Sequence, residues 1–464
     1  MSSLLIKNGR VVDPSQNLDT VTNVLIYDGK IIALDNSIDS ADIVIDASNK
    51  IVSPGFIDIH MHEDPFVDGK PTFSMAKSAL LMGVTTDIGG NCGDNNYDPI
   101  EYYNYLDKYG SYVNLGLFVG HSSLREKFDI NKYCPASDDV IDKMAMMAKE
   151  YLDQGLLGVS FGVKYVPGST TSELVKIASI CHDSNKLVTS HVRQDEDEVF
   201  AACEELCEIA KQAKVRVQFS HIGSMGGYSQ MPQLLKQIDD YRNQGIDMSC
   251  DCYPYNAFCT SIGSTTYDGN FLDRYHSDYS HVYLSSGIYR GKYCDEELFK
   301  LVRNNYPETK AIGFFMNDED IDLAYEKEYI CVGSDGTRDD GHGHPRASGC
   351  FPKFIKDYII TNKVSLLDGI NKMSTFAAKQ IGLINKGNLK VGSDADITIF
   401  DLNTIEDCAT YDEDLLAPKG INYVIINGDI ALKEGEIIKN NLGKAIRIWF
   451  LLKLIIRSKV LKDM

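Results

Sequence analysis

The sequence contains no run of about 18 apolar residues, so it predicts no ordinary membrane-spanning helix. Basic residues are few: 46 lysines and arginines stand against 66 aspartates and glutamates, a formal net charge of −20. Binding to nucleic acid requires a concentrated basic surface, so this charge argues against such a partner. Tryptophan occurs once, at position 449, and no short internal repeat is present.

The chain also lacks the marks of a secreted protein. Its start, MSSLLIKNGRVVD, has no apolar segment of the signal-peptide kind, and its twelve cysteines follow no repeating spacing. We therefore expect reduced thiols in the cytoplasm rather than a disulfide framework.

The two ends of the chain have the texture of short β-strands joined by tight turns. Asn-Gly and Asp-Gly pairs separate apolar runs in LLIKNGRVVD, VLIYDGKIIAL and VIINGDIALKEGEII, which is the typical signal of a β-hairpin. The ends of a chain often lie close together. The pattern predicts one small β-sandwich domain built from residues 1–55 and 386–443.

Between these ends, apolar strand-like segments alternate with helical patterns such as residues 138–155 and 172–185. The segments are GFIDIHMH, GVTTDIGGNC, NLGLFVGH, LLGVSFGVKY, LVTSHVR, VRVQFSHIG, DMSCDCYPY and ICVGSDG. This alternation predicts an α/β fold with a catalytic (β/α)8 barrel, similar to a TIM barrel, over residues 56–385. A long tyrosine-rich connection, about residues 260–325, is expected to cover the mouth of the barrel.

Six potential metal ligands or proton carriers stand at the expected carboxyl ends of these strands. They are His60, His62, Cys92, His191, His221 and Asp335. Active sites of such barrels lie at this end, and residues two apart on a strand point to the same face. A single histidine or cysteine at a strand end is usually structural, but six at one end predict a metal site.

The types of side chain indicate which metal. Neutral imidazoles and a thiolate favour Zn²⁺, with iron or cobalt as alternatives, whereas Mg²⁺ and Ca²⁺ prefer oxygen ligands. The set is large enough for one or two ions. A bound ion would activate water and polarise a carbonyl, and Asp335 could carry the proton to a leaving nitrogen.

Several motifs carry a resemblance to a known family. SPGFIDIHMHED resembles the first-strand motif of the amidohydrolase superfamily. More narrowly, the chain resembles the D-aminoacylases, the N-acyl-D-amino-acid deacylases, whose order of motifs matches GGNCG, VGHSSLR, GVSFGVKYVPG, SHVR, FSHIG, DCYPYNAF and SDGTRDDGHGHPRASGCFP. His191 and His221 are 30 residues apart, as the corresponding ligands of that family are.

The resemblance implies a function and a role for each site residue. The function would be metal-dependent hydrolysis of the linear amide of small N-acyl-D-amino acids. The implied metal ligands are His60, His62, Cys92, His191, His221 and Asp335, with Asp335 also acting as general acid and base. The substrate's carboxylate would be bound by Arg346 of HPR, whose guanidinium can grip it at two points, and by Tyr253 of DCYPY.

The chain departs from the family at two positions. Gly223 stands where the family commonly has a lysine that helps to hold the carboxylate, and Cys259 stands where it has a serine. Arg193 is the candidate to replace the missing cation. The resemblance therefore implies the hydrolysis of an amide more strongly than it implies the family's substrate preference.

Two rival functions remain. A cyclic amidase of the hydantoinase or dihydroorotase kind shares the first-strand motif and would use a carboxylated Lys164, which we read instead as a lysine of the pocket rim. GGNCG and HPR favour the linear amide. A non-catalytic scaffold on the same fold would not need the complete ligand set.

The last segment, residues 444–464, differs from the rest in being basic and apolar. Its apolar core is too short to cross a bilayer. The alternatives are a terminal helix packed on the barrel, an extension without function, and an interfacial helix, of which the interfacial helix with membrane contact is the less favoured.

Overall fold

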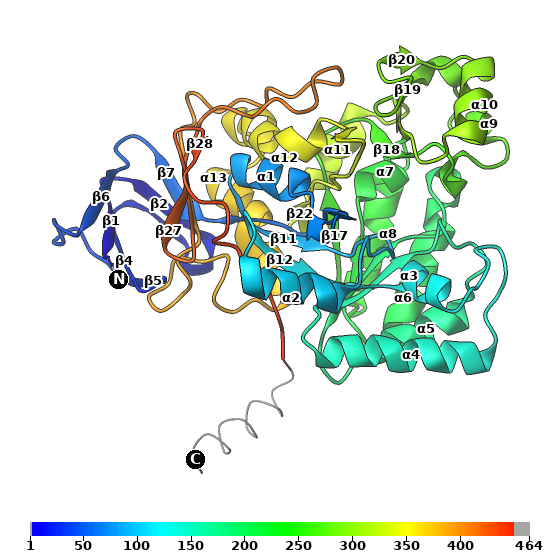
Figure 1. Cartoon of the computed structure of the whole chain (residues 1–464), viewed down its shortest axis with the longest axis horizontal. Coiled ribbons are helices and arrows are strands. Elements are labelled where there is room, and N and C mark those ends of the chain that lie inside the picture. The colour runs from blue at the N-terminus through cyan, green and yellow to red at the C-terminus, as the bar shows by residue number, and fades with distance from the viewer. Residues whose placement is uncertain (1, 450–464) are drawn as a thin grey trace, which may run out of the picture.

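The structure, a computed structural model, describes residues 2–449 and has an α/β fold (Figure 1). Parallel strands alternate with helices through the middle of the chain, which confirms the predicted α/β fold class. The strands are β8 (Phe56–Asp58), β11 (Val84–Gly89), β12 (Asn114–Leu117), β13 (Val119–Gly120), β14 (Gly158–Gly162), β15 (Leu187–His191), β16 (Val217–Phe219), β17 (Met248–Cys252) and β22 (Ile330–Val332). The helices include α1 (Ser74–Leu81), α2 (Pro99–Tyr109), α4 (Asp138–Asp153), α5 (Thr171–Ser179), α6 (Val199–Ala213) and α8 (Met231–Asn243).

The order of the parallel strands brings their carboxyl ends to one side. One sheet has the order β12-β11-β8 and another the order β13-β14-β15-β16-β17-β22, with every pairing parallel. Only Phe118 separates β12 from β13, and a parallel bridge joins Met61, after β8, to Gly336, after β22. The loops that follow the strands therefore gather at one edge.

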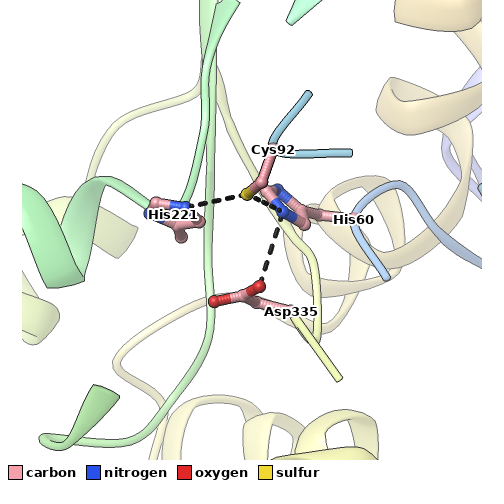
Figure 2. A group of neighbouring side chains, drawn as sticks. All are labelled: His60, Cys92, His221 and Asp335. Carbon is pink, nitrogen blue, oxygen red and sulfur yellow. Dashed lines mark hydrogen bonds and ion pairs between the residues drawn. The ribbon is translucent and has the colours of Figure 1, made fainter. Parts of the chain in front are cut away.

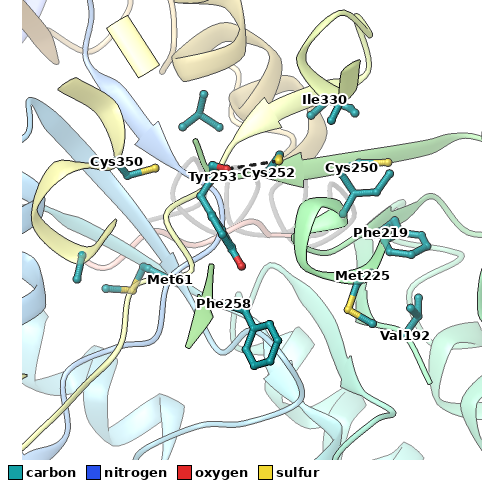
Figure 3. Packing of buried hydrophobic residues seen from close by; sticks show 14 of the residues in the cluster. Met61, Val192, Phe219, Met225, Cys250, Cys252, Tyr253, Phe258, Ile330 and Cys350 are labelled. Carbon is teal, nitrogen blue, oxygen red and sulfur yellow. Dashed lines mark hydrogen bonds between the residues drawn. The ribbon is translucent and has the colours of Figure 1, made fainter. Parts of the chain in front are cut away.

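Helix α4 shows how the sequence determines the outer layer. Asp138 and Asp139 begin it, where acidic side chains complement the helix dipole. Its buried residues recur with helical spacing and form one apolar stripe: Ile141, Met144, Ala145, Ala148 and Leu152. The strands beneath are buried on both faces, as parallel strands covered by helices are. Figure 3 shows part of this core, with Phe219, Cys250 and Ile330 from neighbouring strands.

The two ends of the chain pair with each other. A seven-stranded sheet has the order β28-β27-β26-β25-β7-β2-β3, in which β7 (Ile51–Pro54) pairs antiparallel with β25 (Ile397–Phe400). The remaining strands of that sheet are β2 (Arg10–Asp13), β3 (Leu18–Val21), β26 (Ile421–Ile426), β27 (Asp429–Lys433) and β28 (Glu436–Ile437). A four-stranded sheet, β5-β4-β1-β6, comprises β1 (Leu4–Lys7), β4 (Val24–Tyr27), β5 (Lys30–Leu34) and β6 (Ile43–Asp46). In Figure 1 the blue and red strands lie side by side for this reason.

Two of the three predicted hairpins are confirmed. The pairs Asp28-Gly29 and Asn427-Gly428 have positive φ at both residues and join paired strands, as a type I′ turn requires. The hairpin expected at Asn8-Gly9 is wrong, because β1 and β2 belong to different sheets. Gly9 serves close packing instead: a Cβ there would lie 2.4 Å from the Cγ2 atom of Val52.

The long connection expected near residues 260–325 is ordered rather than a simple loop. It holds the antiparallel sheet β18-β21-β19-β20, of which β19 and β20 are labelled at the top right of Figure 1. Its elements include β18 (Phe258–Ser261), α9 (Phe271–Arg274), β19 (Val282–Leu284), β20 (Lys292–Tyr293), α10 (Glu296–Asn305), β21 (Lys310–Gly313) and α11 (Asp318–Tyr325). Its aromatic residues continue the main apolar core, and Tyr275 stacks on Phe315 with ring centroids 4.7 Å apart.

The start of the C-terminal segment packs on the rest of the chain. The carbonyl of Ile446 accepts a hydrogen bond from the Tyr103 hydroxyl (2.8 Å), and the carbonyl of Ile448 accepts one from Nζ of Lys186 (2.9 Å). Most of the predicted apolar tail, residues 450–464, lies outside the described residues. Within residues 2–449 no helix combines the length and the apolar character needed to cross a membrane.

Candidate metal centre

Four of the predicted site residues converge from loops that follow four different strands (Figure 2). His60 follows β8, Cys92 follows β11, His221 follows β16 and Asp335 follows β22. The backbones of Cys92, His221 and Asp335 are left-handed, with φ of 52°, 33° and 48°. Residues with a Cβ seldom adopt this conformation, which costs about 1–3 kcal/mol each and is found mainly at functional sites. The turn after each strand thus holds the side chain in place at some cost in stability.

The ligand atoms of these residues lie within reach of one ion. Sγ of Cys92 is 3.3 Å from Nε2 of His60 and 3.4 Å from Nε2 of His221. Oδ1 of Asp335 is 3.5 Å from Nε2 of His60. All four side chains are buried, and their ligand atoms lie within 4.8 Å of one another.

The other two predicted ligands flank this group. Nε2 of His62 is 3.2 Å from Oδ1 of Asp335, and the ring of His191 packs against that of His221 with centroids 4.5 Å apart. Nδ1 of His191 is buried and has no hydrogen-bond partner in the described part of the chain. His62, His191 and three of the four convergent residues line one cavity of about 490 Å³, a size that suits a small molecule.

The electrostatics favour the anionic forms of two ligands. Burial raises the pKa of the Cys92 thiol, but the His60 and His221 imidazoles outweigh it and bring the pKa well below its ordinary value. Burial also raises the pKa of Asp335, whereas the Arg346 guanidinium and His221 hold it well below the usual range of a carboxyl. Thiolate and carboxylate are the forms that bind a metal cation.

Asp251 on β17 supports the group and was not singled out from the sequence. Its Oδ1 is 3.0 Å from Nδ1 of His60 and accepts a hydrogen bond from the backbone N–H of His221 (2.8 Å). Its Oδ2 accepts one from Nε2 of Gln218 (2.7 Å). This carboxylate orients His60 so that Nε2 faces Cys92, an arrangement common behind metal-binding histidines. In the sequence, Asp251 is marked only by being a charged residue within the buried strand β17.

The donor set fits a zinc ion. Imidazole, thiolate and carboxylate are the ligands that zinc takes in proteins. Nδ1 of His60 is held by Asp251 and Nδ1 of His221 lies 2.8 Å from Oγ of Ser224, which leaves both Nε2 atoms directed at Cys92. Two histidines oriented in this way, with a buried thiol between them, have the chemistry of a metal site rather than of an apolar core.

Arg346 and Tyr253, predicted to bind a carboxylate, lie beside this group. Nη2 of Arg346 is 2.8 Å from Oδ2 of Asp335, and its guanidinium carbon lies 4.4 Å from the centroid of the Tyr253 ring. Both side chains are buried (Figure 3 shows Tyr253 in the core). Nε and Nη1 of Arg346 and the Tyr253 hydroxyl have no hydrogen-bond partner among residues 2–449. These buried donors lie beside Asp335, and neither residue is among those that line the cavity.

Arg193 is placed elsewhere. Its Nε and Nη2 each lie 2.8 Å from the carboxylate of Glu205, and Nη2 also donates to the carbonyl of Ser169 (3.0 Å). It lines a separate surface hollow and not the cavity of the metal ligands. The structure therefore gives no support to Arg193 as a replacement for the cation that Gly223 lacks.

Lys164 follows β14 and forms a buried ion pair. Its Nζ lies 2.8 Å from Oδ1 of Asp195, which also accepts a hydrogen bond from the Tyr275 hydroxyl through Oδ2 (2.6 Å). Lys164 is buried and is not among the residues that line the cavity, so its assignment to the pocket rim stays a prediction.

Comparison with known proteins relates this geometry to a family. A model described as "Amidohydrolase family" matches residues 320–431. The N-acyl-D-glutamate deacylase of Alcaligenes xylosoxydans xylosoxydans is 29% identical over 459 residues, which cover 92% of each chain. The D-aminoacylase of the same organism is 27% identical over 96% of this chain and 97% of its own. The predicted resemblance to the D-aminoacylases is confirmed.

Solved structures agree. The crystal structure of an N-acyl-D-glutamate deacylase from Bordetella bronchiseptica, complexed with zinc and a phosphonate inhibitor that mimics the tetrahedral intermediate, superposes with a TM-score of 0.87. It is 26% identical, and the match covers 96% of this chain and 99% of that one. Dihydroorotases also match, less closely.

Proposed function

We propose that the chain is a metal-dependent amidohydrolase that cleaves the linear amide of small N-acyl-D-amino acids to a carboxylate and a free D-amino acid. The main support for this proposal is the position of Cys92. Its Sγ lies between the Nε2 atoms of His60 and His221, and the carboxylate of Asp335 is close to Nε2 of His60. Similarity to deacylases along nearly the whole chain supports it.

Zinc, as one or two ions, is the cofactor we infer. The residues that would hold it are His60, His62, Cys92, His191, His221 and Asp335. When bound, zinc is a Lewis acid that polarises an amide carbonyl and makes water acidic enough to act as a nucleophile near neutral pH.

Asp335 is the proton carrier in this proposal. Its low pKa keeps the carboxylate ionised, so Oδ1 can take a proton from the attacking water. The water oxygen forms the new bond to the carbonyl carbon, and Asp335 then gives the proton to the amide nitrogen as the carbon–nitrogen bond breaks. Arg346 and Tyr253 would bind the α-carboxylate through the donors that have no partner within residues 2–449.

We also infer the finer architecture. The parallel strands would close into a (β/α)8 barrel through β12–β13 and the bridge between Met61 and Gly336. The sheets of the two chain ends would form a small β-sandwich. The domain limits we retain are 1–55 and 386–443 for the sandwich, 56–385 for the barrel and 444–464 for the tail. A cytoplasmic location agrees with twelve cysteines that are all free thiols.

A cyclic amidase is the second candidate, and Lys164 is the residue that discriminates. A carboxylated lysine that bridges two metals would have to be released from Asp195, to which Nζ is bound at 2.8 Å. The buried ion pair therefore favours the linear amide.

A hydrolysis screen tests the proposal. Zinc-loaded protein is incubated with N-acetyl-D-amino acids, their L-enantiomers and a cyclic substrate such as dihydroorotate or a hydantoin, and release of amine or ring opening is followed. Hydrolysis of the D-series alone is the expected result. Ring opening without amide hydrolysis would favour the cyclic amidase, and protein that purifies and remains without metal would favour the scaffold.

A further inference from the structure

Position 223, where the resemblance leads us to expect a lysine, carries no cation and lies among apolar side chains. Gly223 lies in α7 (Ile222–Gly226), and a Cβ built on it would be 2.6 Å from Cδ1 of Ile321 and 3.1 Å from Sγ of Cys252. The space beside Gly223 is therefore filled by apolar side chains. A second cation for the substrate has to come from another element.

Lys310 is the cation that the cavity offers. It lies on β21, lines the cavity, is half-buried, and its Nζ donates to Oγ of Ser261 (3.0 Å). It forms no ion pair with a carboxylate of the described chain. The other cavity-lining cations differ: Arg125 is buried against Glu173 (2.5 Å), and Lys132 is exposed. A half-buried ammonium group with only a hydroxyl as partner has an unused capacity to bind an anion.

Strand β18 sets the distance between Lys310 and Arg346. β18 pairs antiparallel with β21, and Ser261 lies opposite Lys310. Two residues earlier, the carbonyl of Cys259 accepts a hydrogen bond from Nη2 of Arg346 (3.3 Å). Residues two apart on a strand are separated by about 6.8 Å. Lys310 and Arg346 are thus each hydrogen-bonded to β18, at residues that are two apart. This separation of the two cations suits a molecule whose two carboxylates are a few bonds apart.

We propose that Lys310 binds the side-chain carboxylate of an acidic substrate, an N-acylated D-aspartate or D-glutamate, while Arg346 binds its α-carboxylate. The inference rests on the proposed function and adds the residue that selects the substrate. Lys310 touches the substrate away from the reacting amide, so it acts on substrate selection and not on the bond-breaking step.

The test compares two substrates of equal size that differ in charge, N-acetyl-D-glutamate and N-acetyl-D-glutamine. The wild-type protein should prefer the glutamate substrate. Lys310→Met should lower the ratio of the two kcat/KM values at least tenfold, mainly through KM of the glutamate substrate, and Lys310→Arg should retain most of the ratio. Lys132→Met, which removes the exposed lysine of the same cavity, is the matched control and should leave the ratio within twofold.

Two outcomes overturn the inference: a wild-type preference for the glutamine substrate, or an unchanged ratio in Lys310→Met, which includes an equal loss on both substrates. The last result would place Lys310 at the α-carboxylate or in a structural role. Failure of the proposed function is a separate result, namely no hydrolysis of any D-substrate by zinc-loaded protein. In that case calorimetric titration with N-acetyl-D-glutamate decides, and an unchanged Kd in Lys310→Met overturns the inference.

Discussion

Replacing Asp251 with asparagine should weaken zinc binding by about 10- to 100-fold and leave the fold intact. The carboxylate of Asp251 holds Nδ1 of His60 at 3.0 Å and the backbone N–H of His221 at 2.8 Å. An asparagine side chain has the same shape, so its oxygen can keep the hydrogen bond from His221 and the position 3.0 Å from Nδ1 of His60. What it lacks is charge. Burial lowers the pKa of His60, and the charge of Asp251 is the main effect that raises it well above the ordinary value.

The magnitude follows from two independent estimates. Loss of a carboxylate behind a metal-binding histidine costs about 10- to 100-fold in affinity, which corresponds to about 1.4–2.7 kcal/mol. A hydrogen bond to a charged group contributes about 1.5–3 kcal/mol and a neutral one about 0.5–1.5 kcal/mol, so loss of the charge alone costs about 1–1.5 kcal/mol at the contact with His60. Asp251 is fully buried, so water does not screen this contact. The second value lies at the lower end of the first range, and Gln218 can turn its amide to suit the new partner.

The assay is a competition titration in which a chromogenic chelator removes zinc from the wild-type protein and from the variant at one pH. Ser224→Ala serves as a comparison variant. Ser224 contacts Nδ1 of His221 through a neutral hydroxyl, so loss of that hydroxyl should weaken zinc binding less than Asp251→Asn does. Thermal melting of each protein verifies that it is folded. A zinc affinity for Asp251→Asn within twofold of wild type would refute the reasoning, because the charge behind His60 would then contribute nothing.

Three further changes test the site. Cys92→Ala should lower the metal retained after dialysis, measured by elemental analysis, because a thiolate ligand is lost; unchanged content would show that Cys92 is not a ligand. Asp335→Asn should reduce kcat by roughly 10²–10⁴ with a smaller loss of metal, and a variant with more than a third of wild-type kcat would exclude the proton-carrying role. Arg346→Met should lower kcat/KM at least tenfold more for a free N-acyl-D-amino acid than for its carboxamide, since a charge-assisted pair contributes about 1.5–3 kcal/mol. Equal losses would mean that Arg346 acts only through Asp335, its partner at 2.8 Å.

The convergence of the site was predictable because parallel strands carry their ends to one edge. Once His60, His191 and Asp335 are placed at strand ends, their meeting follows from topology and needs no knowledge of loop conformation. The sequence does not reveal the left-handed turns at Cys92 and His221, because those conformations are imposed by the packing around each loop and not by the residue type.

Contacts between distant side chains were not predictable. Arg193 is only two residues from the predicted ligand His191 in the sequence. Its guanidinium nevertheless forms an ion pair with Glu205, which lies twelve residues later on α6. Asp251 shows the opposite error, because it supports the site but was not predicted to. A single aspartate in a buried strand forms no sequence pattern that would reveal its partner. Asn8-Gly9 failed for a third reason, since a turn signal specifies a local bend and not whether the flanking strands pair.

The charges of the site explain why it should release protons when it binds a metal. Burial lowers the pKa of His62, but its hydrogen bond to Asp335 and the nearby Cys92 raise it to about 9. The pKa of His60 is also raised, so without a cation both imidazoles hold protons that balance the anions beside them. A metal ion takes over that role, and a protonated imidazole cannot be its ligand. Zinc affinity should therefore increase as the pH rises toward about 9, because fewer protons have to be displaced. The anions that give the site its affinity for a cation thus also oppose binding at low pH.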